Sequence, residues 1–202
     1  MEYTELTDFS ITDMLTSIGN PGDARSFSRV HVTQLIRGLG EELEIPPFNK
    51  SNSNKVNLLD LGGNNYSELG FLWEEVLERT CKEKLGVRTE EVELDGIVGS
   101  PDGFGVSPFG PCIEEYKCTW RSMKNPPHTE WRYMMQVKAY CKILGINQVL
   151  FRVLYINGDY KPPCPQDKAY LYVFDQEEVD QCWFQLTSWG IRAGLLPAAT
   201  GD

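Results

Sequence analysis

The chain has 202 residues and a mass of 23.0 kDa, the size of one compact domain with a sizeable hydrophobic core. Hydrophobic residues make up 41% of it and charged residues 24%, which excludes a disordered chain. The formal net charge of -10 argues against indiscriminate binding to nucleic acid, although a local basic groove is compatible with that total.

The cellular setting is indicated by what the sequence lacks. No apolar run approaches the roughly 18 residues that a membrane-spanning helix needs. The start Met1-Glu2-Tyr3 is acidic and has neither the basic nor the apolar segment of a signal peptide. We therefore expect an intracellular protein without membrane contact, in the cytoplasm or nucleoid, or in the host cytoplasm if the protein is viral.

The six cysteines are scattered along the chain and form no CxxC pair. Their spacing supports neither a disulfide framework nor a zinc site nor an iron–sulfur cluster. We expect reduced, partly buried thiols.

The N-terminal part, residues 1–60, is expected to be mainly helical, with polar loops at 49–54 and 62–65. An amphipathic helix is predicted for residues 67–84, because apolar residues recur there at helical spacing and Gly86 offers a stop. These apolar residues are Leu69, Leu72, Trp73, Val76 and Leu77.

Two adjacent strands are predicted next, at 91–98 and 112–120, joined by a loop rich in glycine and proline. A second helix follows, with Thr129 as its N-cap, Glu130 in its first turn and Gly145 at its end. One face of this helix is apolar and contains Met134, Val137, Cys141 and Leu144.

The last part of the chain contains a buried strand at 148–156, another strand at 169–174 and a helix that begins at Asp175. Glu178 forms a capping-box pattern with Asp175. The apolar face of this helix consists of Val179, Cys182, Trp183 and Leu186. The alternation of helices and strands predicts an α/β fold and one domain over 1–202, whose C-terminal strand and helix lie at 165–202.

The residues whose chemistry is easiest to interpret lie in and just before the strand at 112–120. Residues two apart on a strand share a face, so Glu115 and Lys117 project together while Glu114 projects to the other side. If Asp102 lies at the end of the preceding strand, its carboxylate and that of Glu115 can bind one hard cation, with the Tyr116 carbonyl as a further ligand. Metal, carboxylates and an ammonium are what phosphodiester hydrolysis requires.

Each of these signals has a plainer interpretation. A Pro-Asp pair often marks a turn, and a Glu-x-Lys triplet is often an exposed strand face. Glu74 lies beside the apolar stripe of the helix at 67–84, where it could add a carboxylate, or it could simply be solvated. Gln136 and Tyr140 lie four residues apart on the second helix, where they could contact the site or rest on the sheet. The order and spacing of these elements favour the catalytic interpretation.

Together these elements resemble the PD-(D/E)xK nuclease superfamily, in its RecB-type branch, and within it phage lambda exonuclease and YqaJ-like viral exonucleases. The resemblance covers residues 67–156, the expected catalytic core, and rests on five ordered features. They are GFLWE at 70–74, SPDG at 100–103, EYKC at 115–118, QVKAY at 136–140 and the strand that follows.

The resemblance implies a restriction-endonuclease-like fold, with a central mixed β-sheet flanked by α-helices. It implies that Asp102, Glu115 and Glu74 bind Mg²⁺ or Mn²⁺, with two ions in the site. Lys117 would act in catalysis, and Gln136 would support Lys117 or the substrate. Neither the cysteine spacing nor Trp73, at a position where some members carry histidine, matches the branch with an iron–sulfur cluster, so no cluster is expected.

The loop between Asp102 and Glu115 is longer than in the compact phage exonucleases, so substrate access is expected to differ. The substrate would be DNA, and the side chains assigned to contact it are Tyr140, Arg29, Thr33 and Arg132. A homo-oligomer and a recombination partner such as a single-strand annealing protein are also expected.

These features predict a Mg²⁺-dependent exonuclease that acts on duplex ends in recombination, repair or phage replication. A structure-specific or sequence-specific endonuclease would share the same core. A catalytically inert DNA-binding or interaction domain would share the fold, although the presence of Asp102, Glu115 and Lys117 argues against it.

Overall fold

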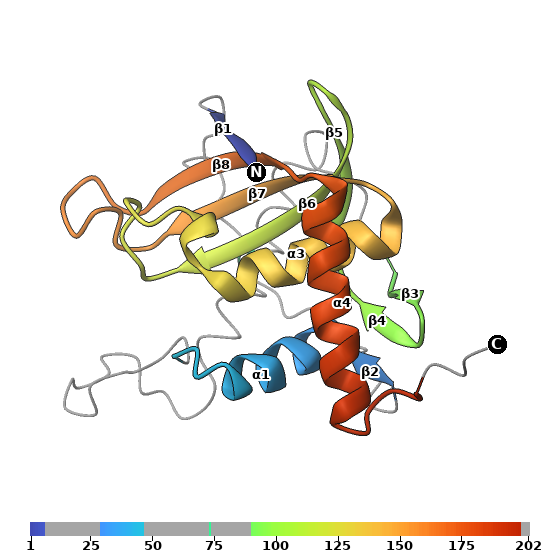
Figure 1. Ribbon diagram of the computed structural model, residues 1–202. Coiled ribbons are helices and arrows are strands. Elements are labelled where there is room, and N and C mark those ends of the chain that lie inside the picture. Colours follow the sequence, from blue (N-terminus) through green and yellow to red (C-terminus); the bar gives the residue numbers. More distant parts are fainter. Residues whose placement is uncertain (7–28, 47–72, 74–89, 199–202) are drawn as a thin grey trace.

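The computed structural model describes residues 1–6, 29–46, 73 and 90–198 (Figure 1). Its main sheet has five strands in the order β1-β8-β7-β6-β5. The strands are β1 (Glu2–Leu6), β5 (Gly103–Ser107), β6 (Gly110–Thr119), β7 (Gln148–Tyr155) and β8 (Gln166–Val173). β6 and β7 run parallel and the other neighbours antiparallel, so the sheet is mixed.

Helix α3 (Trp131–Leu144) makes the crossover that the parallel pair β6 and β7 requires, and the short helix η1 (Pro127–Thr129) precedes it. The buried face of α3 packs on one side of the main sheet and belongs to one hydrophobic core. That core includes Met134, Val137 and Cys141 from the helix, and Ile113, Val149 and Phe151 from the strands. The expected apolar stripe therefore faces the sheet.

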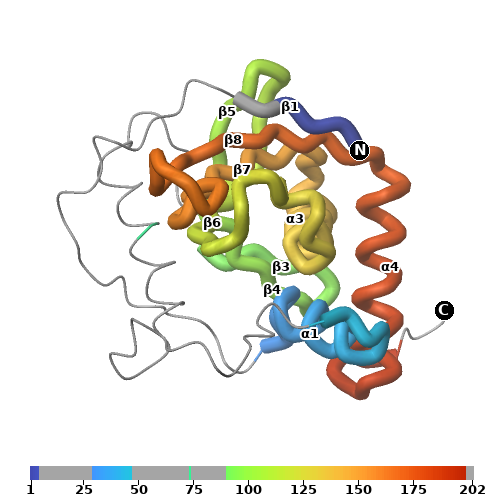
Figure 2. Tube along the Cα trace, turned by 90° about the vertical axis from the view of Figure 1, so that its left-hand side faces the viewer, coloured from blue at the N-terminus to red at the C-terminus, as the bar shows by residue number. Residues whose placement is uncertain are grey.

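A smaller sheet lies beyond α3 and has the order β2-β4-β3. Its strands are β2 (Val30–His31), β3 (Val92–Leu94) and β4 (Ile97–Gly99), and β2 leads directly into α1 (Val32–Glu42). Helix α4 (Gln176–Arg192) contacts both α3 and α1, and Figure 2 shows it running along one side of the molecule. These contacts join the small sheet and α1 to the main sheet.

Several expectations about the elements are confirmed. The strands expected at 148–156 and 169–174 are β7 and β8. Asp175 and Glu178 form the expected capping box of α4, and Gly145 ends α3 with a φ of 65°. The predicted helix at 67–84, including Glu74, lies outside the described residues except for Trp73, which is helical and buried. The prediction of a single domain over 1–202 stays a prediction.

Three expectations were wrong. The strand at 91–98 is a hairpin of two strands, because Asp95 and Gly96 have φ values of 52° and 76° and form a tight turn. The long loop after Asp102 contains β5, which pairs with β6. Glu130, not Thr129, is the N-cap of α3, since the Glu130 carboxylate accepts a hydrogen bond from the Arg132 backbone N–H.

Of the N-terminal part, which was expected to be mainly helical, the described residues contain the edge strand β1, which pairs with β8, together with β2 and α1. The rest of that prediction lies outside the described residues. In the described ranges, no helix combines the length and apolar character required to cross a membrane.

Candidate active site

The site begins with the alternation of side chains along β6. Glu115 and Lys117 line one pocket, on the face of the sheet that α3 covers. Glu114 and Tyr116 turn to the opposite face, where both bond within a buried cluster with Arg152 of β7. Glu115, and not Glu114, is therefore the carboxylate that lines this pocket.

Asp102 is positioned by the point at which β5 begins. The pairing of β5 with β6 starts at Gly103, which lies opposite Glu114. Because the N–H groups of a strand point alternately to its two edges, the next N–H of β6 on the β5 edge is that of Tyr116. The Asp102 carboxylate accepts that N–H through Oδ2 at 2.7 Å. The Tyr116 carbonyl points to the same side as its N–H in an extended strand, which keeps it a candidate metal ligand.

The pocket holds most of the predicted site in one cavity of about 90 Å³. Asp102, Glu115, Lys117, Gln136 and Tyr140 all line it. The small sheet and the start of α1 supply its opposite wall, which includes His31, Val32, Thr33 and Ser100. The site is thus built between the main sheet, the small sheet and two helices.

Lys117 is held as an ammonium group next to two carboxylates. Its Nζ donates to Glu115 Oε1, and the Glu115 side chain is only 1% exposed. Burial alone would lower the pKa of Lys117, but the negative charges of Glu115 and Asp102 outweigh burial and raise the pKa above its ordinary value. Lys117 is therefore a cation and a hydrogen-bond donor in this arrangement.

Gln136 and Tyr140 form a hydrogen-bonded chain that ends at Ser100, in the loop of residues 100–102 that carries Asp102. Gln136 Nε2 donates to the Tyr140 hydroxyl at 2.8 Å, and that hydroxyl donates to the Ser100 carbonyl at 3.3 Å. Gly99 allows this approach, because a Cβ there would lie 2.8 Å from the Tyr140 ring. Tyr140 was assigned to substrate contact, yet it is 2% exposed and its hydroxyl bonds within the protein. This favours a role in positioning the loop that carries Asp102.

Tyr140→Phe is expected to weaken Mg²⁺ binding about 10-fold, because the Ser100 carbonyl loses the donor that fixes the Asp102 loop. Isothermal titration calorimetry with Mg²⁺ measures this change. Tyr172→Phe is the matched control, since the Tyr172 hydroxyl is also buried and hydrogen-bonded, to His128, outside the pocket. Equal Mg²⁺ affinity in wild type and Tyr140→Phe would exclude this positioning role.

The remaining predicted contact residues have different positions. Arg29 forms ion pairs with Glu91 and Glu93, and Arg132 donates to the carbonyls of Ile45 and Pro46 after α1. Both guanidinium groups thus bind groups of the protein itself, and their assignment to DNA stays a prediction. Thr33 lines the pocket at the first turn of α1.

Sequence reasoning missed three residues beside this site. His31 and Ser100 line the pocket, and the ring centroid of Tyr133 lies 5.6 Å from Lys117 Nζ. Tyr133 precedes Gln136 by three residues on α3, a spacing that could have revealed it. His31 had no such signal, because its place depends on the parallel pairing of β2 with β4.

The donor set fits a hard divalent cation. Asp102 and Glu115 offer carboxylate oxygens to one pocket, and Mg²⁺ is commonly bound by one or two carboxylates together with water and substrate phosphate. Within the ranges that the structure describes, no three His, Cys, Asp or Glu side chains are grouped closely enough to hold an ion. Asp102 and Glu115 are thus the described side chains of the pocket that could hold such an ion.

Comparison with known proteins gives a match in structure only. No family model matches the chain, and no curated protein matches it in sequence. An alkaline exonuclease from Laribacter hongkongensis superimposes with a TM-score of 0.49 and 14% identity, over 83% of this chain and 89% of that chain. A phage-related exonuclease from Haemophilus somnus 129PT superimposes with a TM-score of 0.52 and 16% identity, over 80% of this chain and 91% of that chain. The predicted resemblance is confirmed at the level of the fold, which this chain shares with the phage-related exonuclease.

Proposed function

We propose that the chain is a Mg²⁺-dependent nuclease that hydrolyses phosphodiester bonds in DNA, acting as an exonuclease on duplex ends. The observation that carries the proposal is the meeting of Asp102, Glu115 and Lys117 in one pocket. The shared fold with a protein described as a phage-related exonuclease supports it. Recombination, repair or phage replication is the proposed setting.

Asp102 and Glu115 would hold the metal, together with the Tyr116 carbonyl and the predicted third carboxylate of Glu74. Bound Mg²⁺ would supply Lewis-acid stabilisation of the phosphate and a more acidic water. The backbone N–H of Tyr116 keeps the Asp102 carboxylate in place at 2.7 Å. We propose two metal ions in the site, on the basis of the resemblance to the PD-(D/E)xK nucleases.

Lys117 would act on the phosphate or on the attacking water. Its ammonium lines the pocket beside the Glu115 carboxylate, where it can donate a hydrogen bond to an oxygen that gains negative charge. Gln136 also lines the pocket, and its amide is oriented by the Tyr140 hydroxyl. These side chains would bind and orient the reacting groups.

Lys117→Ala is expected to lower Mg²⁺-dependent cleavage of an end-labelled linear duplex by about 100-fold. Lys138→Ala is the matched control, because Lys138 forms a similar part-buried ion pair, with Glu178, outside the pocket. Its activity should stay close to that of wild type. Full activity in Lys117→Ala would remove this mechanism, and inactivity of wild type with Mg²⁺ or Mn²⁺ would favour an inert scaffold.

The same assay on covalently closed circular DNA separates the two kinds of nuclease. An exonuclease leaves closed circles intact and degrades the plasmid after linearisation. Equal cutting of both forms would replace the exonuclease proposal with the endonuclease alternative.

A further inference from the structure

Tyr133 lies next to the Lys117 ammonium and has no part in the proposed mechanism. It is the third residue of α3, three residues before Gln136 and seven before Tyr140, so all three share one helical face. Lys117 Nζ lies over the Tyr133 ring, 5.6 Å from its centroid, which is within the range of a cation–π contact. The ammonium thus has both an aromatic ring and the Glu115 carboxylate as neighbours.

The Tyr133 ring is itself fixed by the sheet. Its centroid lies 6.3 Å from that of Phe151, with the two rings tilted by 43°. Phe151 is fully buried on β7, and its Cα is paired in register with that of Glu115 on β6. Glu115 on β6 and Phe151 on β7 are thus neighbours in the sheet. The Tyr133 ring of α3 packs on Phe151, so both groups next to Lys117 are held by this part of the sheet.

A lysine side chain has a flexible four-carbon stem, so a single ion pair restricts its ammonium poorly. We propose that Tyr133 is a positioning residue that confines the Lys117 ammonium against the Glu115 side of the pocket by its aromatic ring. This inference rests on the proposed function, because it assigns Tyr133 a part in the same reaction. The ring performs this role, and the hydroxyl does not.

Two substitutions separate the ring from the hydroxyl. Tyr133→Leu is expected to lower kcat about 10-fold with KM little changed, because a contact to the reacting ammonium is lost. Tyr133→Phe keeps the ring and should retain the wild-type kcat. An equal loss in both variants would assign the effect to the hydroxyl and overturn the proposal.

Phe174→Leu is the matched control, since its ring lies 5.3 Å below Lys138 Nζ, outside the pocket. It removes a buried aromatic side chain of the same core, so it reports what a loss of packing alone does. Its kcat should equal that of wild type even if its Tm falls. A loss of kcat as large as that of Tyr133→Leu would show a general packing effect and overturn the proposal.

A spectroscopic measurement tests the contact without any nuclease assay. In protein labelled with ¹³C-lysine, the Hε resonance of Lys117, assigned by its loss in Lys117→Ala, should be shifted upfield by the ring. The shift should persist in Tyr133→Phe and disappear in Tyr133→Leu. An unshifted resonance in wild type would overturn the proposal, whether or not the protein cleaves DNA. If wild type is inactive but the shift is present, the nuclease proposal fails while the confinement of Lys117 stands.

Discussion

Asp102→Asn is expected to lower Mg²⁺-dependent cleavage by about three orders of magnitude, the effect of losing several kcal/mol of metal-assisted stabilisation. Asparagine has the shape of aspartate and keeps a carbonyl oxygen that can accept the Tyr116 N–H, now held at 2.7 Å. The start of β5 and its register with β6 should therefore be preserved. What is lost is a negative charge at the pocket, and with it the attraction for a divalent cation.

Two measurements check this expectation. Calorimetric titration with Mg²⁺ should show weaker binding in Asp102→Asn, and the thermal unfolding midpoint without metal should change little. Asp95→Asn is the control, because Asp95 lies outside the pocket. Its carboxylate accepts a hydrogen bond of 3.1 Å from the Trp183 indole N–H. Unchanged Mg²⁺ affinity in Asp102→Asn would show that the ion binds elsewhere and would remove Asp102 from the proposed site.

The pocket could be predicted from sequence where it depends on local geometry. Strand alternation alone put Glu115 and Lys117 together and Glu114 apart, and the structure has that arrangement. Helical spacing put Gln136 and Tyr140 on one face of α3, where both line the pocket. Both periods are properties of the backbone and need no knowledge of the tertiary fold.

The features that could not be predicted depend on pairing between distant segments. The glycines of β5 hide its strand character, although Gly105 is needed there because a Cβ would lie 2.4 Å from Glu114 Oε1. His31 reaches the pocket only because β2 pairs with β4, far along the chain. The hydrogen bond from Tyr140 to the Ser100 carbonyl likewise depends on how α3 packs against β4. Local patterns in the sequence do not specify such contacts.

The face of β6 opposite the pocket carries a buried ionic cluster. Arg152 donates to Glu114 through Nη2 at 3.0 Å and through Nε at 3.2 Å, and the Tyr116 hydroxyl donates to Glu114 at 2.6 Å. Glu114 is 2% exposed and Arg152 is 8% exposed. Because the backbone N–H of Tyr116 holds Asp102, the cluster and the pocket share one residue of β6. The buried Glu114 carboxylate on the strand that carries the site is therefore compensated by the Arg152 guanidinium.

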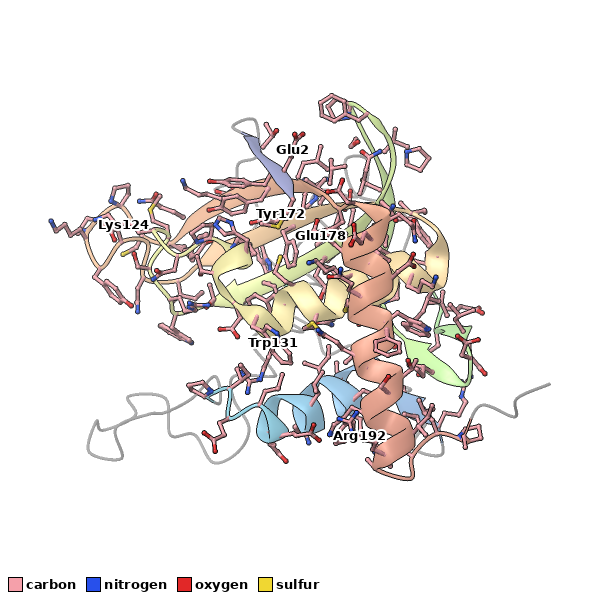
Figure 3. All side chains as sticks on the ribbon, in the orientation of Figure 1. Glu2, Lys124, Trp131, Tyr172, Glu178 and Arg192 are labelled. Carbon is pink, nitrogen blue, oxygen red and sulfur yellow. The ribbon has the colours of Figure 1, made fainter. Side chains whose placement is uncertain are left out.

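Arg152→Met is expected to reduce the free energy of unfolding by about 3–5 kcal/mol, because it leaves the Glu114 carboxylate buried without its guanidinium partner. The double variant Glu114→Met/Arg152→Met should recover much of this loss, since apolar replacement of a buried pair is often nearly neutral. Lys124→Met is the control, because the Lys124 side chain projects from the surface (Figure 3) and is 76% exposed. Loss of its ion pair with Asp159 should cost less than about 1 kcal/mol. Urea unfolding measures all three. A double variant less stable than Arg152→Met would contradict this expectation. It would show that the Glu114–Arg152 ion pair itself stabilises the fold, and that the unpaired Glu114 carboxylate is not the cause of the loss.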